Sequence, residues 1–239
     1  LFGQTQTALS ATENLYQISA GLNAARTYDD ILIALRVHTV MGEAKYGGLF
    51  LFNHPWEDEM PEKVSVLAEW GSSQEMIAIL RQVSLQDLPV ARILRRDEPV
   101  WVEDIWKDDR FDVSARALYG ALDTRAVFFV PLVTEGRWIG FLSAGWPEPT
   151  ASDPASLRLL MAVAGQAAVA AQNLQRLQEI QVRAQREQTL RETVATINAS
   201  EDLVAGLPAI TRHLRGLVPL TSLALTTYTP GEHEYTLFT

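Results

Sequence analysis

The stretch from Asp153 to Ala199 restricts the fold most, because it carries a helix start signal and, apart from Gly165, no residue that would end a helix. Asp153 can accept hydrogen bonds from the free amides of a first turn, and Pro154 suits the first helical position. Apolar residues recur at helical spacing in the first part and become sparse between Gln181 and Thr189. The pattern predicts one helix of ~70 Å at 1.5 Å per residue, whose later part is a solvated linker.

The region before this helix contains both helical and strand patterns. Leu15, Ile18 and Leu22 recur at helical spacing, and Thr27 is placed to cap a second helix whose first turn is acidic. Five runs have the composition of strands: Tyr46–Phe52, Val64–Trp70, Val100–Val102, Arg125–Val133 and Trp138–Trp146. Short helices are expected at Ser72–Val83 and Val90–Arg96, and the charged stretch Asp104–Leu122 is expected to be irregular.

The N-terminal pattern recurs near the C-terminus with a constant offset. A shift of 175 residues, which pairs Leu15 with Leu190, keeps two helices and a strand in register without gaps. Shared helical periodicity explains part of this agreement, but the unbroken register favours a duplication. Residues 190–239 are therefore expected to begin a second copy, with strands at Val218–Thr227 and Glu234–Phe238. Two strands are marginal alone, so this piece is expected to pack on a partner chain or to continue into a longer domain.

The composition excludes several classes of chemistry. The chain has no cysteine, which rules out disulfides, thiolate nucleophiles and cysteine-bound zinc. Its formal net charge of −9 opposes binding to a phosphate backbone, so we expect no nucleic-acid partner. The longest apolar stretch, Leu159–Ala171, is shorter than the ~20 residues of a spanning helix, so no membrane segment is expected within this chain. We expect a cytoplasmic location, in a parent protein whose membrane anchor, if it has one, lies outside this sequence.

No arrangement of residues predicts catalysis or metal binding. Phosphate-binding glycine loops and the Gly-x-Ser-x-Gly elbow are both missing from the sequence. The four histidines (His38, His54, His213 and His233) do not have the spacing of metal ligands, and His38 is better explained as a structural residue on a helix face. We therefore expect no enzyme activity and no metal, and the sequence identifies no cofactor.

The stretch Arg95–Gln178 resembles the GAF family in the order and spacing of its motifs. The matching segments are Arg96-Asp-Glu-Pro-Val-Trp-Val-Glu-Asp104, Asp109-Arg-Phe111, Phe129-Val-Pro-Leu-Val133, Gly136-Arg-Trp-Ile-Gly-Phe-Leu142, Asp153-Pro-Ala-Ser-Leu-Arg-Leu-Leu160 and Ala164-Gly-Gln-Ala-Ala-Val-Ala-Ala-Gln-Asn173. Together with the preceding helices, the resemblance covers about Leu9–Leu177.

This resemblance implies an α+β fold of the GAF/PAS type. An antiparallel sheet of about five or six strands carries helices on one face and a ligand pocket under loops on the other, and a long linker helix follows. The chain would then divide into a linker (1–8), a GAF domain (9–177), a linker helix (178–189) and an incomplete second GAF domain (190–239). Such domains usually sit in sensor histidine kinases, cyclic-dinucleotide enzymes or transcription regulators, with an output domain that would lie outside this chain.

The residues that known GAF relatives use for their ligands and reactions limit which ligand this chain can bind. Reduction of free methionine sulfoxide and covalent attachment of a bilin both use cysteine, which this chain lacks. The Asn-Lys-x-Phe-Asp-Glu segment of relatives that bind cyclic nucleotides is also missing from the sequence. The resemblance therefore predicts a small-molecule ligand without naming it.

A pocket that mixes aromatic and polar side chains is the candidate site. Ligand pockets are largely apolar with a few placed polar groups. The candidate lining residues are Phe50, Trp70, Trp101, Asp104, Phe111, Arg116, Tyr119 and Phe129. The same aromatics can instead fill the core of the sheet, with Asp104 capping a turn. Both sheet faces are expected to be covered, so strand alternation does not decide between the two.

Two functions fit these patterns. The first is a non-catalytic sensory domain that binds a small molecule in a pocket of roughly a few hundred Å³ and passes the signal along its flanking helices. The alternative is a ligand-free dimerisation and spacer module, in which the long helix forms a coiled-coil seam with a second copy. A homodimer is expected in both cases, through Leu157, Leu160, Ala164, Ala167, Ala171 and Leu174.

Overall fold

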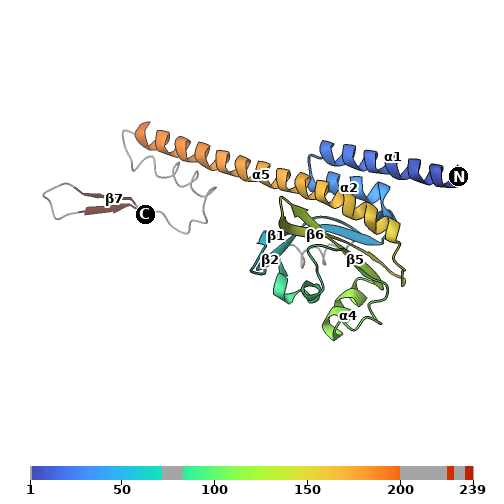
Figure 1. Ribbon diagram of the computed structural model, residues 1–239. Coiled ribbons are helices and arrows are strands. Elements are labelled where there is room, and N and C mark those ends of the chain that lie inside the picture. Colours follow the sequence, from blue (N-terminus) through green and yellow to red (C-terminus); the bar gives the residue numbers. More distant parts are fainter. Residues whose placement is uncertain (1, 72–82, 200–224, 229–234, 239) are drawn as a thin grey trace. The chain divides into compact units, whose positions relative to one another are not determined.

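A computed structural model describes residues 2–71, 83–199, 225–228 and 235–238 of the chain (Figure 1). The chain divides into two compact units, Leu1–Leu174 and Gln175–Thr239. The first unit holds the sheet, and each unit is described by itself.

The chain begins with two helices that pack on each other. Helix α1 spans Phe2–Ala24, so residues 2–8 of the expected linker are helical, and α2 spans Tyr28–His38. Thr27 caps α2 as predicted: its side chain accepts a hydrogen bond from the Asp30 amide, and the Asp30 carboxylate accepts one from the Thr27 amide. This reciprocal pair satisfies two amides that a helix start leaves open. A 3₁₀ turn, η1 (Val40–Glu43), leads into the sheet.

The sheet has six strands in the order β3-β2-β1-β6-β5-β4, and every neighbouring pair is antiparallel. Their bounds are β1 Tyr46–Trp56, β2 Lys63–Trp70, β3 Val83–Ser84, β4 Val100–Val102, β5 Ala126–Thr134 and β6 Arg137–Trp146. The predicted antiparallel α+β architecture is confirmed. The turn between β5 and β6 has positive φ at both Glu135 and Gly136.

Side chains along the central strands alternate between two buried layers. On β1, Leu49 and Leu51 belong to one hydrophobic cluster, whereas Phe52 belongs to the other, with Phe50 packed against it. We call these the helix-side core and the loop-side core. Residues from α1, α2 and the long helix α5 fill the helix-side core, and the chain between β3 and β5 fills the loop-side core. In Figure 1 the three helices lie above the sheet and α4 lies below it.

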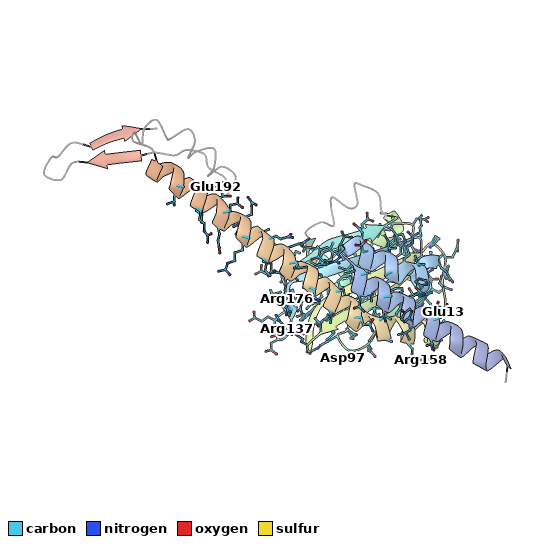
Figure 2. The ribbon with its side chains drawn as sticks, turned by 90° about the horizontal axis from the view of Figure 1, so that it is seen from above. Glu13, Asp97, Arg137, Arg158, Arg176 and Glu192 are labelled. Carbon is cyan, nitrogen blue, oxygen red and sulfur yellow. The ribbon has the colours of Figure 1, made fainter. Side chains whose placement is uncertain are left out.

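Helix α5 spans Pro154–Ala199 without a break, as the sequence predicted. Asp153 accepts hydrogen bonds from the amides of Ala155 and Ser156, which confirms it as the N-cap. Beyond Leu174 most α5 side chains that are described are exposed; Arg176 and Glu192 lie in this part (Figure 2). Pro154–Glu192 has the length and apolar composition of a membrane span, but core helices pass the same test and residues of its first part are buried in the helix-side core.

The stripe expected to form a dimer seam is part of the domain's own core. Leu160, Ala164, Ala167 and Ala171 are at most 2% exposed and belong to the helix-side core, with Leu174 packed against it. Leu157 is half-buried. Helical spacing of apolar residues indicates a buried face but does not show what covers that face. Here the sheet and helices α1 and α2 cover it. The four buried residues therefore cannot pack against a second copy in this structure.

Three further expectations have different outcomes. Residues 113–121 of the supposedly irregular stretch form helix α4 (Val113–Ala121), which Asp112 caps by accepting a hydrogen bond from the Ala115 amide. The helix expected at Val90–Arg96 is only a 3₁₀ turn, η3 (Pro89–Arg92), after a similar turn, η2 (Leu85–Asp87). The helix expected at Ser72–Val83 lies outside the described residues, apart from Val83 in β3.

In the second unit, β7 (Leu225–Tyr228) and β8 (Tyr235–Phe238) form an antiparallel hairpin. β8 lies within the predicted strand Glu234–Phe238, and β7 overlaps the end of the predicted strand Val218–Thr227 and extends one residue beyond it. The first helix of the repeat, which begins near Leu190, falls within the last part of α5. The second, which the same shift places after residue 200, lies outside the described residues.

Ala167→Leu tests whether the α5 stripe is core or seam. Ala167 is fully buried, so the larger side chain should lower the free energy of unfolding by about 1–3 kcal/mol through overpacking. Ala162→Leu, at an exposed position of the same helix, should change it little. Urea unfolding at two protein concentrations gives the measurement. A loss of stability seen only at the lower concentration would place the stripe in an interface.

Candidate ligand cavity

A small cavity lies in the loop-side core, between the sheet and the chain that connects β3 to β5. Its volume is about 50 Å³, well below the roughly 300–1,000 Å³ of occupied ligand pockets and below the few hundred Å³ that the sequence led us to expect. The lining is almost wholly apolar: Tyr46, Phe50, Leu88, Val90, Leu118, Tyr119, Leu122, Phe129, Phe141 and Ser143. The cavity is therefore an internal gap in the loop-side core.

Strands β1, β5 and β6 form the floor of the cavity with stacked aromatic rings. The rings of Phe50 and Phe141 are parallel with centroids 4.7 Å apart, and Phe129 meets Phe141 edge to face at 6.0 Å. Phe111 packs its edge against Tyr119 at 5.7 Å. These offset and edge contacts stabilise the ring positions, and turns and α4 form the opposite wall of the cavity.

Tyr46 is the most unusual lining residue. It lies opposite Gly145 in the β1–β6 ladder, and a side chain at Gly145 would collide with its ring. Among the described residues its hydroxyl, which is buried, has no hydrogen-bond partner. Burial raises the pKa of Tyr46 far above its ordinary value, against a smaller opposing effect of a weak interaction with the Thr124 side chain. The Thr124 hydroxyl donates its own hydrogen bond to the Leu122 carbonyl oxygen and does not meet hydrogen-bond geometry with Tyr46 Oη. An unpaired buried hydroxyl costs about 1–3 kcal/mol, so the fold tolerates this group without using it.

Tyr119 lies across the same cavity on α4. Burial, followed by the nearby Tyr46, raises its pKa well above the ordinary value. Both phenols are therefore neutral at physiological pH. None of the described residues that line the cavity is charged.

An ion pair between a buried carboxylate and a half-exposed arginine connects the chain between β3 and β5, which we call the loop layer, to the sheet. The Asp104 carboxylate, whose side chain is 7% exposed, accepts hydrogen bonds from Arg125 Nη2 at 2.8 Å and Nε at 3.3 Å. It also accepts one from the Trp106 amide, and Lys107 lies 3.7 Å away. The hydrogen bond from Arg125 is the main reason that the pKa of Asp104 is lowered, against the opposing effect of burial. Asp104 thus joins the turn that follows β4 to the residue that precedes β5.

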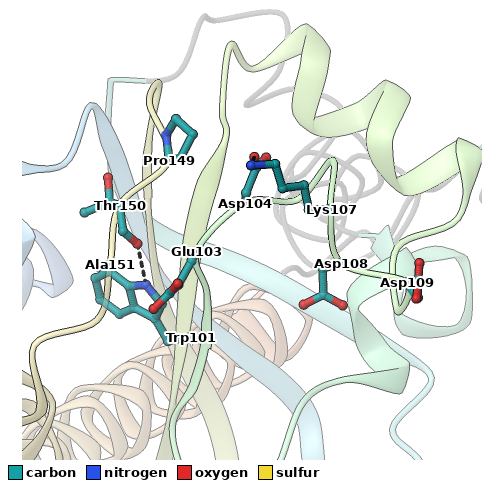
Figure 3. A pocket seen from close by; sticks show the side chains of 9 residues that line it. All are labelled: Trp101, Glu103, Asp104, Lys107, Asp108, Asp109, Pro149, Thr150 and Ala151. Atoms are coloured by element: carbon teal, nitrogen blue, oxygen red, sulfur yellow. Dashed lines mark hydrogen bonds and ion pairs between the residues drawn. The ribbon is translucent and has the colours of Figure 1, made fainter.

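An open groove of about 790 Å³ lies beside this ion pair (Figure 3). Four carboxylates line it, but the Asp108 carboxylate is paired with Arg110, whose hydrogen bond lowers its pKa, and Glu103 accepts a weak hydrogen bond from the Ser152 amide. In the part of the chain that the structure describes, no group of acidic and histidine residues is placed to hold a metal ion. The groove is larger than the cavity, but it is shallow and internally paired, and we treat the cavity as the candidate site.

The structure separates the residues expected to line a pocket. Phe50, Tyr119 and Phe129 line the cavity, and Phe111 lies directly behind Tyr119. Trp101 and Asp104 line the open groove, where the Trp101 indole donates to the Thr150 carbonyl oxygen at 2.8 Å (Figure 3).

The other two expected residues lie elsewhere. Arg116 donates to the Asp108 carbonyl oxygen and does not line the cavity. Trp70 packs against the helix-side core over Gly47, with the Arg36 guanidinium 4.9 Å from its ring centroid. Trp70 therefore belongs to the opposite face of the sheet from Phe50 and Phe129, so the three do not form one floor.

Sequence reasoning missed Tyr46 and Ser143, the two strand residues that bring polar groups to the cavity. Tyr46 begins the first strand and faces Gly145 near the end of β6. This glycine could have indicated the site in the sequence, because a glycine inside a strand often marks the close approach of another group. Ser143 differs from its neighbours only in being polar within an apolar strand.

A scan against protein families matches residues 25–172 to the GAF domain. The chain belongs to the GAF family. No curated protein sequence matches it.

Solved structures agree with the GAF fold. The GAF domain of an Acinetobacter phosphoenolpyruvate-protein phosphotransferase is 17% identical with a TM-score of 0.55, covering 71% of this chain and 97% of that one. The corresponding domain from Coxiella burnetii is 17% identical with a TM-score of 0.56, covering 72% and 98%. A bacteriophytochrome of R. palustris is 14% identical with a TM-score of 0.52 and covers 98% of this chain, which spans half of that structure.

Asp104→Asn should lower the free energy of unfolding by about 1.5–3 kcal/mol at neutral pH, the usual contribution of a hydrogen bond to a charged group. Because the folded pKa of Asp104 lies below its unfolded value, its contribution is complete above about pH 4 and is lost as the pH falls through the folded pKa. The gap between the two proteins should therefore close in acid.

Asp123→Asn is the matched control, since the Asp123 ion pair with Lys45 is exposed and exposed pairs contribute only about 0–1 kcal/mol. Chemical denaturation between pH 3 and 7 makes the comparison. A gap for Asp104→Asn that stays constant into acid would show that the ionised carboxylate is not the stabilising group.

Proposed function

We propose that this GAF domain is a non-catalytic sensory module of a larger signal-transduction protein, in which a small molecule enters the loop-side cavity and the response passes to helix α5. The observation that carries this proposal is the apolar gap between the aromatic floor and the chain that connects β3 to β5. Protein interiors are close-packed, and gaps larger than a water molecule are few. A gap on one face of a sheet whose other face is filled by helices is a plausible starting point for a ligand site.

The small size of the cavity suggests how binding would act. A ligand of more than a few atoms needs more than about 50 Å³, so it would bind a form in which the loop layer has moved outward. A ligand shifts an equilibrium only as far as its affinities for the two forms differ. Here that difference would come from the displaced segment, Leu85–Leu122, which carries η2, η3, β4 and α4.

Short contacts support a path from this segment to α5. The Thr150 amide donates to the Glu103 carbonyl oxygen at 3.1 Å, and the Thr150 carbonyl oxygen accepts from the Trp101 indole. Thr150 stands three residues before Asp153, the cap of α5. Movement of the β4–α4 connection would therefore change the start of the long helix.

The alternative is a ligand-free dimerisation and spacer module, and exposed apolar residues favour some helical partner. Leu177, Ile180, Leu190 and Val194 on α5 are 52–63% exposed. A homodimer through this later part of α5, in place of the buried stripe, is compatible with the sensory role.

Several wider features remain part of the proposal. A sensor histidine kinase or similar parent with a separate output domain, a cytoplasmic location, and a second GAF copy after residue 190 are supported by the GAF membership, the composition and the repeat. The family match itself covers a single stretch that ends at residue 172.

Amide hydrogen exchange with cyclopentane as an apolar probe tests the sensory role. Saturating cyclopentane should change exchange in α4 (Val113–Ala121) and in the first turns of α5, while α1 stays unchanged because it lies on the other side of the sheet. Ser143→Val, which fills the cavity, should abolish the change and keep the near-ultraviolet circular dichroism of the folded protein.

Two results would refute the proposal in different ways. No effect of cyclopentane on any segment would mean that the cavity does not take ligands. Altered exchange in α4 with no change in α5 would mean that occupancy is not relayed, and would favour the spacer module.

A further inference from the structure

We propose that the cavity recognises a small, uncharged, mainly apolar molecule that carries a hydrogen-bond acceptor, and that the Tyr46 hydroxyl donates to this acceptor. The inference rests on the proposed function and specifies the ligand class for the same site. It depends on three features of the described residues: the unpaired hydroxyl, the neutral lining and the way Gly145 holds the tyrosine ring.

The unpaired hydroxyl supplies the polar contact. Tyr46 Oη is buried without a hydrogen-bond partner among the described residues, on a side chain that lines the cavity. Buried polar groups are nearly always paired in native proteins, so an exception calls for an explanation. A ligand carbonyl or ether oxygen would supply the missing acceptor. The free energy that the unpaired hydroxyl costs on folding would then be recovered when the ligand binds.

The lining excludes charged ligands. Among the described residues it contains five aromatic rings, four aliphatic side chains and Ser143, but no lysine, arginine or histidine. A carboxylate or phosphate placed here would lose its hydration without gaining a cation, which costs far more than a neutral acceptor loses. The nearby guanidinium of Arg125 is already held by Asp104.

The position of Tyr46 is built into the sheet. Its ring occupies the space that a side chain at Gly145 would take, so the ring is held against the strand while its hydroxyl stays unpaired. A tyrosine needed only for packing would be replaced by phenylalanine without loss. The structure therefore assigns Tyr46 a role in specificity.

Three probes of similar size separate these requirements. Cyclopentanone carries a neutral acceptor, methylenecyclopentane has the same shape without one, and cyclopentanecarboxylate is an anion. NMR titration of the full chain should show the ketone binding about three- to tenfold more tightly than the hydrocarbon, the range for one net hydrogen bond. The anion should not bind.

Tyr46→Phe should remove the preference for the ketone, leave the affinity for methylenecyclopentane unchanged, and raise the melting temperature of the unliganded protein. A purely structural hydroxyl would give the opposite change in melting temperature. Tyr16→Phe, at an exposed position on α1, should change neither property and serves as the matched control.

The outcomes distinguish this inference from the proposed function. Equal binding of ketone and hydrocarbon to the wild type, or tighter binding of the anion, overturns the inference and leaves the cavity as a ligand site. A preference for the ketone that survives in Tyr46→Phe also overturns it. Failure of all three probes to bind overturns the proposed function together with the inference.

Discussion

Burial of both faces of one antiparallel sheet is the constraint on which the rest of this structure depends. The central strands place apolar residues on each side, with Leu49, Phe128 and Leu142 in the helix-side core and Phe129 and Phe141 in the loop-side core. Because both faces of the sheet are apolar, each face must be covered by another layer of the protein. The small side chains of Ala164, Ala167 and Ala171 let α5 approach one face closely. The other face is left to turns and one short helix, which fill space less completely.

This asymmetry accounts for the place of the cavity. A stripe of small residues on a long helix packs uniformly, whereas η2, η3 and α4 meet the sheet through side chains of different lengths. The gap that results borders Tyr119 on α4 and Leu122 directly after it. Ligand-binding segments are drawn from the less stable parts of a fold. Around β4, the Asp104–Arg125 ion pair and the Trp101–Thr150 hydrogen bond hold the loop layer. The second of these contacts leads to the cap of α5, so this wall of the cavity and the long helix share an anchoring segment.

Local signals in the sequence predicted much of this fold. The caps at Thr27 and Asp153 and the uninterrupted helix α5 depend on neighbouring residues, and the structure contains all three. Helix α4 was missed because it has only nine residues and lies in a charged stretch, although Asp112 is a recognisable cap. The resemblance to GAF domains supplied the sheet and the placement of the helices, which periodicity alone does not give.

The candidate site was less accessible to sequence reasoning, because it depends on which face each residue takes. Trp70 and Phe129 are both strand aromatics, but they lie on opposite faces, and both faces are apolar, so alternation gave no warning. The apolar stripe on α5 was equally ambiguous. Apolar residues have the same helical spacing whether they pack against a partner chain or against the domain's own sheet. Tyr46 went unnoticed because its importance comes from Gly145, about a hundred residues later in the chain.

Crystallography of the protein under xenon pressure tests the central claim most directly, because xenon enters enclosed apolar cavities. The account predicts xenon density in the loop-side core against Tyr46, Phe129 and Tyr119, and none between α5 and the sheet. Xenon bound beneath α5 with nothing beside Tyr46 would contradict it, since the helix-side core would then hold the gap and the loop-side core would be solid.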